Sequence, residues 1–288
     1  MLSVLPLTAR PYGREVIAPV VDRAWWEAHR DSVVLADVRW YLDGRSGRAA
    51  YDAGHLPGAV FVDLDRWLSR RGEPAEGRHP LPEPEVFAAG MSRLGIADGS
   101  VVVAYDDQGG VIAARLVWLL RVTGHDAALL DGGLSAYAGP LSTEPVLPEP
   151  ADFTATPWPP QRLAGLEDAV NPAATVLDAR PPERYRGDTE PVDPRAGHIP
   201  GAVNVPCRDN LDANGRFLPA EALRRRLRAA GVVEGADVVS YCGSGVTACH
   251  NLIALELAGL GPGRLYAGSW SAYSSTPGRP VATGDAPG

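Results

Sequence analysis

The chain has 288 residues, of which 45% are hydrophobic, and its 27 basic residues are all arginine, with a formal net charge of −8. This length exceeds what one hydrophobic core usually serves, so we expect two domains. The apolar content excludes a disordered chain. The negative charge disfavours nucleic acid and anionic membrane surfaces as main partners.

Nothing in the sequence indicates export or a membrane. No apolar stretch approaches the roughly 20 residues of a membrane span, and Met1 to Arg14 has no charged leader followed by an apolar core. The three cysteines, Cys207, Cys242 and Cys249, are an odd number without zinc-site spacing. We therefore expect a cytoplasmic protein without a disulfide framework or a bound metal.

An internal repeat organises the chain. Each copy holds the same landmarks in the same order: an apolar run ending in Asp-x-Arg, a Gly-His-x-Pro-Gly-Ala-Val segment, an apolar run ending in tyrosine, and a Ser-Ala-Tyr. The first three landmarks occupy residues 33–39, 54–60 and 101–105 in the first copy, and 174–180, 197–203 and 237–241 in the second. Four landmarks in one order indicate a duplication.

The predicted elements alternate along each copy. The short apolar runs are typical of buried strands, and helices are expected over residues 84–94, 111–123, 219–230 and 246–258. This alternation predicts an α/β fold of two domains, each a parallel sheet with helices on both faces. Proline-rich residues 141–160 indicate an extended linker, so the expected domains are 1–140 and 161–288.

The two copies differ in the residue that follows the tyrosine of the later strand. The second copy has Cys242 there, at the start of Cys-Gly-Ser-Gly-Val-Thr, whereas the first copy has Asp106. Ligands of open α/β sheets bind at this strand end. Inward-facing amides of a glycine-rich loop and the helix dipole behind it favour the thiolate, the nucleophilic form of cysteine. We expect Cys242 to be catalytic and the first domain to be inactive.

A plainer interpretation makes Cys242 one more buried cysteine, as most intracellular cysteines are. We expect that interpretation to hold for Cys249, two helical turns further on, and expect no catalytic role for Cys207 in its loop.

With these motifs, residues from about Ala18 to Tyr273 resemble the tandem-domain rhodanese family. Within it, the cysteine loop resembles that of 3-mercaptopyruvate sulfurtransferases, because thiosulfate enzymes typically carry Arg and Lys where this chain has Gly243 and Ser244. The resemblance implies two rhodanese-like domains, activity in the second only, and no cofactor.

The resemblance also implies roles for individual residues. Arg184 and Arg195 would hold the carboxylate and keto groups of the substrate, and Ser244 would assist the enolate. His55 and Trp40 of the first domain would face the cysteine. Amides of the loop would stabilise a persulfide, the loop residues being Gly243, Ser244, Gly245, Val246 and Thr247.

For these residues a structural interpretation also stays open. The arginines could pair with acidic neighbours, Ser244 could be a small loop residue, and His55 could be a structural cap. The acidic neighbours of the arginines are Glu183, Asp188, Glu190 and Asp193.

The expected reaction moves sulfur from 3-mercaptopyruvate through a Cys242 persulfide to cyanide or to a thiol such as thioredoxin or a low-molecular-weight thiol. One alternative is thiosulfate as the donor, and another is a persulfide carrier loaded by a different enzyme. A cysteine phosphatase would need arginine at position 248, where the chain has Ala248.

Overall fold

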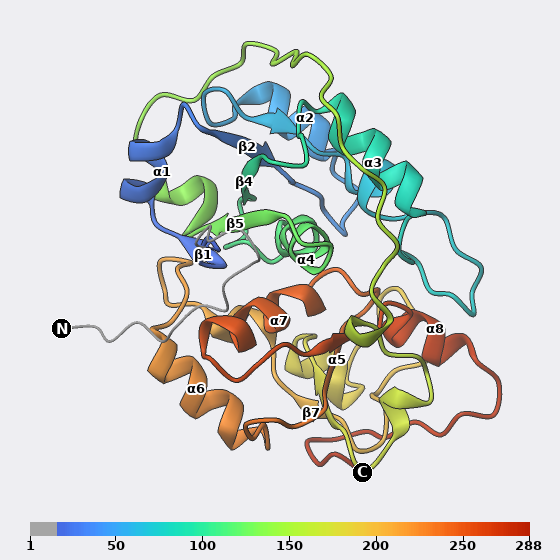
Figure 1. The fold of residues 1–288 in the computed structure, drawn as a ribbon. Helices are drawn as coiled ribbons and strands as arrows, with labels where there is room; N and C mark the ends of the chain where they lie inside the picture. The colour runs from blue at the N-terminus through green and yellow to red at the C-terminus, as the bar shows by residue number, and fades with distance from the viewer. Residues whose placement is uncertain (1–15) are drawn as a thin grey trace.

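The computed structural model describes residues 16–288, so the prediction on Met1 to Arg14 lies outside the described residues. Two α/β halves are stacked on each other, each built on a parallel sheet (Figure 1). The predicted fold class is confirmed.

The first half holds a five-stranded sheet in the order β1-β5-β4-β2-β3, with every pair parallel. Its strands are β1 (Val20–Val21), β2 (Val33–Asp37), β3 (Val60–Phe61), β4 (Val101–Tyr105) and β5 (Asp126–Leu130). Its helices are α1 (Arg23–His29), α2 (Gly47–Ala53), α3 (Pro84–Arg93) and α4 (Ala114–Val122), with a π-helical turn η1 (Leu64–Leu68) and a 3-10 turn η2 (Gly133–Ala136).

The second half holds a four-stranded parallel sheet in the order β7-β6-β8-β9. Its strands are β6 (Thr175–Asp178), β7 (Val203–Asn204), β8 (Val238–Tyr241) and β9 (Arg264–Leu265). Its helices are α5 (Pro182–Arg186), α6 (Ala220–Ala229), α7 (Ala248–Leu257) and α8 (Ser269–Ser275), with 3-10 turns η3 (Pro160–Arg162), η4 (Asp168–Val170) and η5 (Cys207–Asn210).

Helices α4 and α7 begin later than the sequence pattern predicts. The expected helices start at residues 111 and 246, but the regular helices start at Ala114 and Ala248. In the first half the reason is visible: the N–H groups of Ile112 and Ala113 donate to the carboxylate of Asp106. The loop therefore curls around the side chain at the end of the strand before the helix begins.

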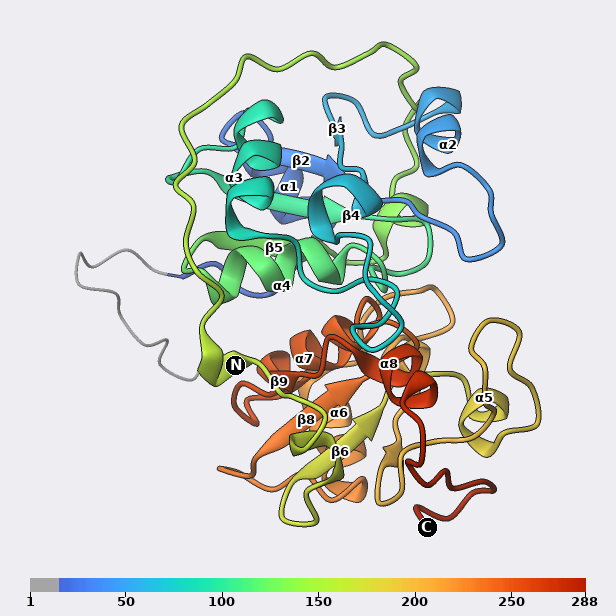
Figure 2. The same cartoon turned by 90° about the vertical axis from the view of Figure 1, so that its right-hand side faces the viewer.

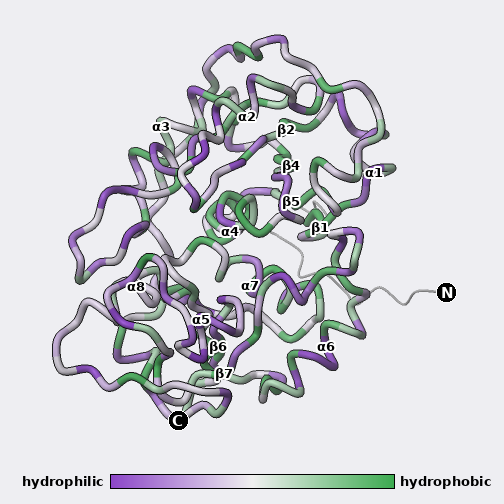
Figure 3. The backbone as a smooth tube through the Cα atoms, turned by 180° about the vertical axis from the view of Figure 1, so that it is seen from behind, coloured by the Kyte–Doolittle hydropathy of each residue, from purple (hydrophilic) through white to green (hydrophobic). Residues whose placement is uncertain are grey.

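The two halves share one hydrophobic core. Helices α4 and α7 are almost entirely buried against each other, and the same cluster of apolar side chains continues into both sheets. Figure 3 shows hydrophobic residues gathered along the strands and along α4, in the middle of the molecule. The carboxyl end of β8 consequently faces the first half rather than open solvent.

The chain between the halves runs along the outside of the molecule (Figure 2). It follows the first half closely, since Ser142 pairs with His55 and Phe153 packs edge-on against Phe87. Trp158 donates its indole N–H to the Pro82 carbonyl at 2.8 Å. The division at residues 140 and 160 stays a prediction.

Candidate active site

Cys242 lies at the carboxyl end of β8, the central strand whose Tyr241 is in register with Asp178 of β6. The thiol is buried, and its Sγ accepts a hydrogen bond from the Gly245 N–H at 3.1 Å. Gly245 has φ +80°, and a Cβ there would lie 2.6 Å from the Ala267 carbonyl oxygen. Only glycine allows the loop to turn its amide towards the sulfur at this point.

The start of α8 supports the cysteine loop from behind. Ser269, at φ +53°, accepts the Cys242 N–H on its hydroxyl at 3.1 Å, and the Trp270 N–H donates to the Cys242 carbonyl at 2.9 Å. The matching residue of the first half is Gly133, with φ +54°. Ser269 therefore occupies a strained backbone conformation that glycine adopts freely. In return, its hydroxyl accepts a hydrogen bond from the N–H of Cys242.

The first half shows what this kind of loop holds. Asp106 stands where Cys242 stands in the second half, and its buried carboxylate accepts four backbone N–H groups at 2.7–2.9 Å. These donors belong to Gln108, Gly110, Ile112 and Ala113. The loop architecture is thus an anion receptor, which the first half fills with its own side chain.

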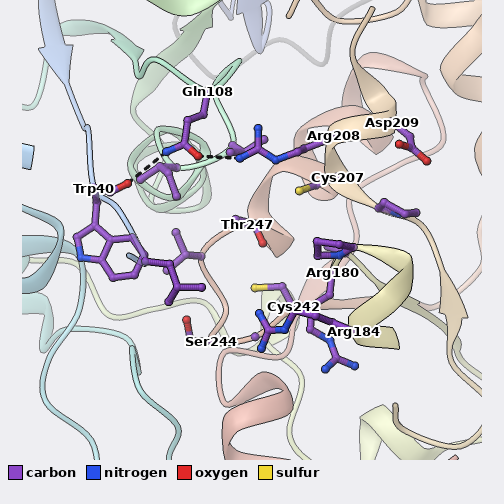
Figure 4. Close-up of a pocket in the computed structure, with 18 of the residues that line it drawn as sticks. Trp40, Gln108, Arg180, Arg184, Cys207, Arg208, Asp209, Cys242, Ser244 and Thr247 are labelled. Carbon is purple, nitrogen blue, oxygen red and sulfur yellow. Dashed lines mark hydrogen bonds between the residues drawn. The ribbon is translucent and has the colours of Figure 1, made fainter. Parts of the chain in front are cut away.

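A cavity of about 360 Å³ lies in front of the thiol, lined by residues from both halves (Figure 4). Most of the predicted site residues line it, namely Trp40, Arg184, Cys242, Gly243, Ser244, Val246 and Thr247. Gly245 lies just behind, bound to the sulfur through its amide. The cavity is therefore a chamber between the two halves, with Cys242 at its wall and Cys207 also among its lining residues.

Ser244 is tied to a histidine that the sequence analysis did not select. Its hydroxyl lies 2.7 Å from His79 Nδ1, and His79 Nε2 lies 3.4 Å from Asp65. The hydrogen bonds from His79 and from the Trp40 indole lower the pKa of the Asp65 carboxyl. Serine, histidine and aspartate thus form a chain suited to moving a proton.

Comparing the two copies could have pointed to His79. The first copy reads Gly-Arg-His before Pro-Leu-Pro at residues 77–82, and the second copy reads Gly-Arg-Phe before Leu-Pro at residues 215–219. The first copy thus has the titratable ring of His79 where the second copy has the apolar ring of Phe217. The two copies differ at the strand end in the same way, with Asp106 in one and Cys242 in the other.

Two arginines flank the cysteine loop at Gly243. A Cβ on that glycine would lie 3.1 Å from the Arg78 guanidinium and 3.4 Å from that of Arg184. Both arginines form ion pairs with the buried Asp193, and Arg184 also pairs with Glu190 at 2.6 Å. Burial raises the pKa of Asp193, although the nearby guanidiniums oppose this shift. Arg78 and Arg184 thus belong to an ion-pair network beside the thiol, which continues from Glu190 through Arg180 to Asp178.

Arg195 does not line the cavity. Its guanidinium donates to backbone carbonyls that follow and include the end of α8, at 2.6–3.2 Å, and not to an acidic neighbour. These carbonyls belong to Tyr273, Ser274, Thr276 and Arg279. With four hydrogen bonds donated inside the fold, the guanidinium fastens the C-terminal segment and does not lie beside the thiol, where the second substrate anchor was predicted.

His55 also lies away from the cavity. Its ring is fully buried, stacks on Tyr51 with centroids 3.8 Å apart, and contacts the Tyr51 carbonyl through Nδ1 at 2.9 Å. His198 stacks on Tyr185 in the same way in the second half. The shared geometry fits the interpretation of these histidines as structural caps, and it does not bring His55 to face Cys242.

Two further thiols lie near Cys242. Cys249 lies inside α7, and Cys207 lines the cavity near its far wall (Figure 4). Burial raises the pKa of each thiol to about 12. Both are therefore protonated at neutral pH and are poor nucleophiles.

Neither a metal cluster nor a membrane span is found in the part of the chain that the structure describes. Residues 16–288 contain no group of three or more side chains arranged to hold a metal ion. Over the same residues, the helices are too short or too polar to cross a membrane.

The fold and site define a tandem α/β protein with the buried Cys242 thiol at the strand end of its second half, facing a chamber between the halves. The rhodanese-like domain family matches residues 21–139 and 160–276. The chain therefore belongs to the rhodanese family, and it is a sulfurtransferase.

Individual relatives span almost the whole chain. A Pseudomonas aeruginosa protein named "Probable 3-mercaptopyruvate sulfurtransferase" is 46% identical, over 88% of this chain and 93% of its own. "Thiosulfate/3-mercaptopyruvate sulfurtransferase 2" of Arabidopsis thaliana is 32% identical, over 91% of this chain and 86% of its own. The solved 3-mercaptopyruvate sulfurtransferase SseA of Escherichia coli is 31% identical, with a TM-score of 0.78 over 88% of this chain and 99% of its own.

Proposed function

We propose that the protein takes a sulfur atom from 3-mercaptopyruvate onto Cys242 and passes it, as a persulfide, to a thiol or to cyanide. The observation that carries this proposal is the buried sulfur at the end of β8, held by a loop amide in front of an arginine-flanked cavity. The names of several relatives support 3-mercaptopyruvate as the donor.

The first half-reaction is nucleophilic and covalent. The Cys242 thiolate attacks the sulfur of 3-mercaptopyruvate, and a sulfur–sulfur bond forms as the carbon–sulfur bond breaks. The electron pair of the broken bond leaves on the three-carbon fragment as the enolate of pyruvate. Protonation of that enolate at carbon gives pyruvate.

We propose Arg184 and Arg78 as the pair that holds the donor carboxylate, with Arg78 in the role predicted for Arg195. Both guanidiniums line the cavity beside Gly243, and a guanidinium fork suits a planar carboxylate. Because both already pair with Asp193, the donor carboxylate would compete with that side chain.

The Ser244 hydroxyl would stabilise the enolate oxygen and relay a proton to the enolate. His79, 2.7 Å from this hydroxyl, would supply the proton, and Asp65 would hold the histidine ring in place. Trp40 would fix Asp65 through its indole N–H, which donates at 3.1 Å. This assigns the predicted residue Trp40 a supporting role in the site.

In the second half-reaction an acceptor thiolate attacks the outer sulfur of the persulfide, and Cys242 leaves as a thiolate. The amides of Gly243 to Thr247 would stabilise the persulfide meanwhile. Thioredoxin, a low-molecular-weight thiol or cyanide would accept the sulfur, and we place the reaction in the cytoplasm. The first domain, 1–140, would shape the chamber without reacting itself.

The deciding experiment is a pyruvate-release assay with 3-mercaptopyruvate, together with intact-mass spectrometry before acceptor is added. We expect pyruvate release and the added mass of one sulfur atom on wild type, and neither on Cys242→Ser. A folded wild-type protein that stays unmodified would disprove the proposal. Persulfide formation only after loading by a second enzyme would identify a carrier.

The rival donor is thiosulfate, which the name of the Arabidopsis relative also includes. Comparing kcat/KM for the two donors decides between them. We expect 3-mercaptopyruvate to be preferred, because two arginines with compensating carboxylates suit a carboxylate donor, while the loop itself has no cation for a dianion. Arg184→Ala should reduce 3-mercaptopyruvate use more than thiosulfate use.

A further inference from the structure

A wholly buried arginine of the first half reaches the back of the cysteine loop. Arg115, in α4, donates from Nη1 to the Gly245 carbonyl at 2.9 Å. Its other donors reach the His79 carbonyl at 3.2 Å and the Leu68 carbonyl at 3.2 Å. One guanidinium thus joins the cysteine loop to the segments that carry His79 and end η1.

These three partners are neutral. Over residues 16–288, no carboxylate oxygen lies within ion-pair distance of Arg115, which distinguishes it from the cavity arginines Arg78 and Arg184. A buried cation without a countercharge is strongly disfavoured, so a nearby anion is expected. Burial lowers the pKa of Arg115, and two thiols oppose that shift: first that of Cys249, which is hydrogen-bonded to the guanidinium, and then that of Cys242.

Cys249 is a poor candidate for that anion, because burial raises the pKa of its thiol to about 12. Cys242 remains. Its sulfur is bound to the N–H of Gly245, the residue whose carbonyl Arg115 holds. Arg115 and the sulfur therefore bind the two sides of one loop residue, the guanidinium through the Gly245 carbonyl and the sulfur through the Gly245 N–H.

We infer that Arg115 is the counter-cation of the Cys242 sulfur, supplied to the second domain by the first. The inference rests on the proposed function, in which this sulfur is anionic both as thiolate and as persulfide. Arg115 is a positioning residue: it acts through the loop and does not touch the substrate. Through Arg115, the first half would stabilise the negative charge on the Cys242 sulfur.

Other charged groups face Cys242, but each differs from Arg115. Arg78, Arg180 and Arg184 line the cavity and pair with carboxylates, while Arg208 is exposed at the rim and reaches Gln108. The carboxylates near the cavity are Asp178, Glu190, Asp193 and Asp209. The remaining titratable groups are the His79 ring, behind Ser244, and the thiol of Cys207, across the cavity. Arg115 alone, among these described groups, is both buried and without a carboxylate.

The test is the rate at which iodoacetamide alkylates Cys242, located by peptide mass spectrometry, in the full-length protein between pH 6 and 9. Arg115→Met should slow alkylation at pH 7 by about tenfold, the effect of one unit in the thiol equilibrium. Arg115→Lys, which keeps the charge, should react close to the wild-type rate.

The matched control is Arg121→Met. Arg121 belongs to the same helix and also crosses between the halves, pairing with Glu256 of α7, but it does not contact the cysteine loop. We expect wild-type alkylation in this variant. Equal slowing by Arg121→Met, wild-type reactivity in a folded Arg115→Met, or Arg115→Lys as slow as Arg115→Met would each overturn the inference.

If Arg115→Met fails to fold, the thermal unfolding of Cys242→Ser tests the pairing from the other side. Loss of the sulfur anion should lower the Tm by more than Cys207→Ser does, because Cys207→Ser replaces a buried thiol that carries no charge. An unchanged Tm in Cys242→Ser would overturn the pairing. The alkylation assay needs no sulfur donor. If 3-mercaptopyruvate proves not to be the donor, the assay still tests whether Arg115 acts on the Cys242 sulfur.

Discussion

At the scale of single residues, Arg78 and His79 are neighbours in the chain, and both contribute to the chamber in front of Cys242. Arg78 pairs with Asp193 of the second half, while the His79 ring contacts Ser244. The segment that carries them is fixed further by the Arg78 N–H, which donates to the Ser271 hydroxyl at 3.1 Å. A short loop of the first half thus supplies two functional groups to the site of the second.

His79→Ala should lower kcat for pyruvate release by about 100-fold, the usual size of a general-acid contribution. Transfer from thiosulfate should change less, because sulfite departs as an anion that needs no proton. Steady-state assays with both donors measure the difference, with His29→Ala as the control, since His29 packs on Trp25 at the surface. Equal losses with both donors would contradict the proposed relay.

Asp193→Asn should lower the KM for 3-mercaptopyruvate by about tenfold, because hydrogen bonds to charged groups contribute about 1.5 kcal/mol and the amide competes less for the guanidiniums. Steady-state kinetics measures this, and kcat should change little. Asp188→Asn is the control, because Asp188 pairs only with Arg186 at the surface. A raised KM in Asp193→Asn would show that the carboxylate orients the arginines and does not compete with the donor.

The sequence selected Cys242, which lies at the end of β8 as predicted, but only some of the residues around it. Cys242 was predictable because a repeat places it at a strand end beside a glycine-rich turn, all within a few residues. Arg78, His79 and Arg115 reach the site from the first half. A local sequence pattern cannot predict contacts between residues so far apart in the chain. Arg195 was selected from the resemblance to the family, but its guanidinium donates to carbonyls at and after the end of α8.

At the scale of elements, strands and helices followed closely from hydrophobic pattern and turn residues, because buried parallel strands require continuous apolar runs. The helix starts did not: α4 begins late because loop N–H groups donate to Asp106, and α7 begins late as well. The start of α8 is another such place. It was not distinguished in the sequence, although its serine supports the cysteine loop.

Ser269→Gly should lower kcat by about tenfold with little change in the free energy of unfolding. Glycine relieves the positive φ but removes the hydroxyl that accepts the Cys242 N–H, and such a bond contributes about 1 kcal/mol. Kinetics and urea unfolding measure the two effects. Ser269→Ala, which lacks the hydroxyl and keeps the strain, should lose both activity and stability, and a fully active Ser269→Gly would refute the role of the hydroxyl.

At the scale of the whole molecule, the shared core buries the thiols of Cys207 and Cys249, so the free energy of unfolding should depend on pH in the alkaline range. The pKa of Cys207 and of Cys249 rises from 9.0 to about 12 on folding because burial disfavours the thiolate. The protonated thiol belongs to the folded state, so the unfolded chain releases these protons first. Stability is therefore fully present below about pH 9 and is lost between about pH 9 and 12.

Urea unfolding from pH 7 to 11 should show this loss in wild type, and Cys249→Ala should show a shallower decline, although its starting stability is lower because of the cavity. Val117→Ala, a buried truncation in α4 without a titrating group, should keep the wild-type slope. The same slope in Cys249→Ala as in wild type would contradict burial of this thiol as its cause.

The carboxylate of Asp106 has a consequence for how the duplicated halves diverged. The loop of the first half is filled permanently by a side chain of its own, so no external anion can enter it. In the proposed reaction, the loop of the second half keeps its anionic sulfur and gains and loses one sulfur atom in every turnover. The duplication has thus produced one permanently occupied loop and one that exchanges its cargo.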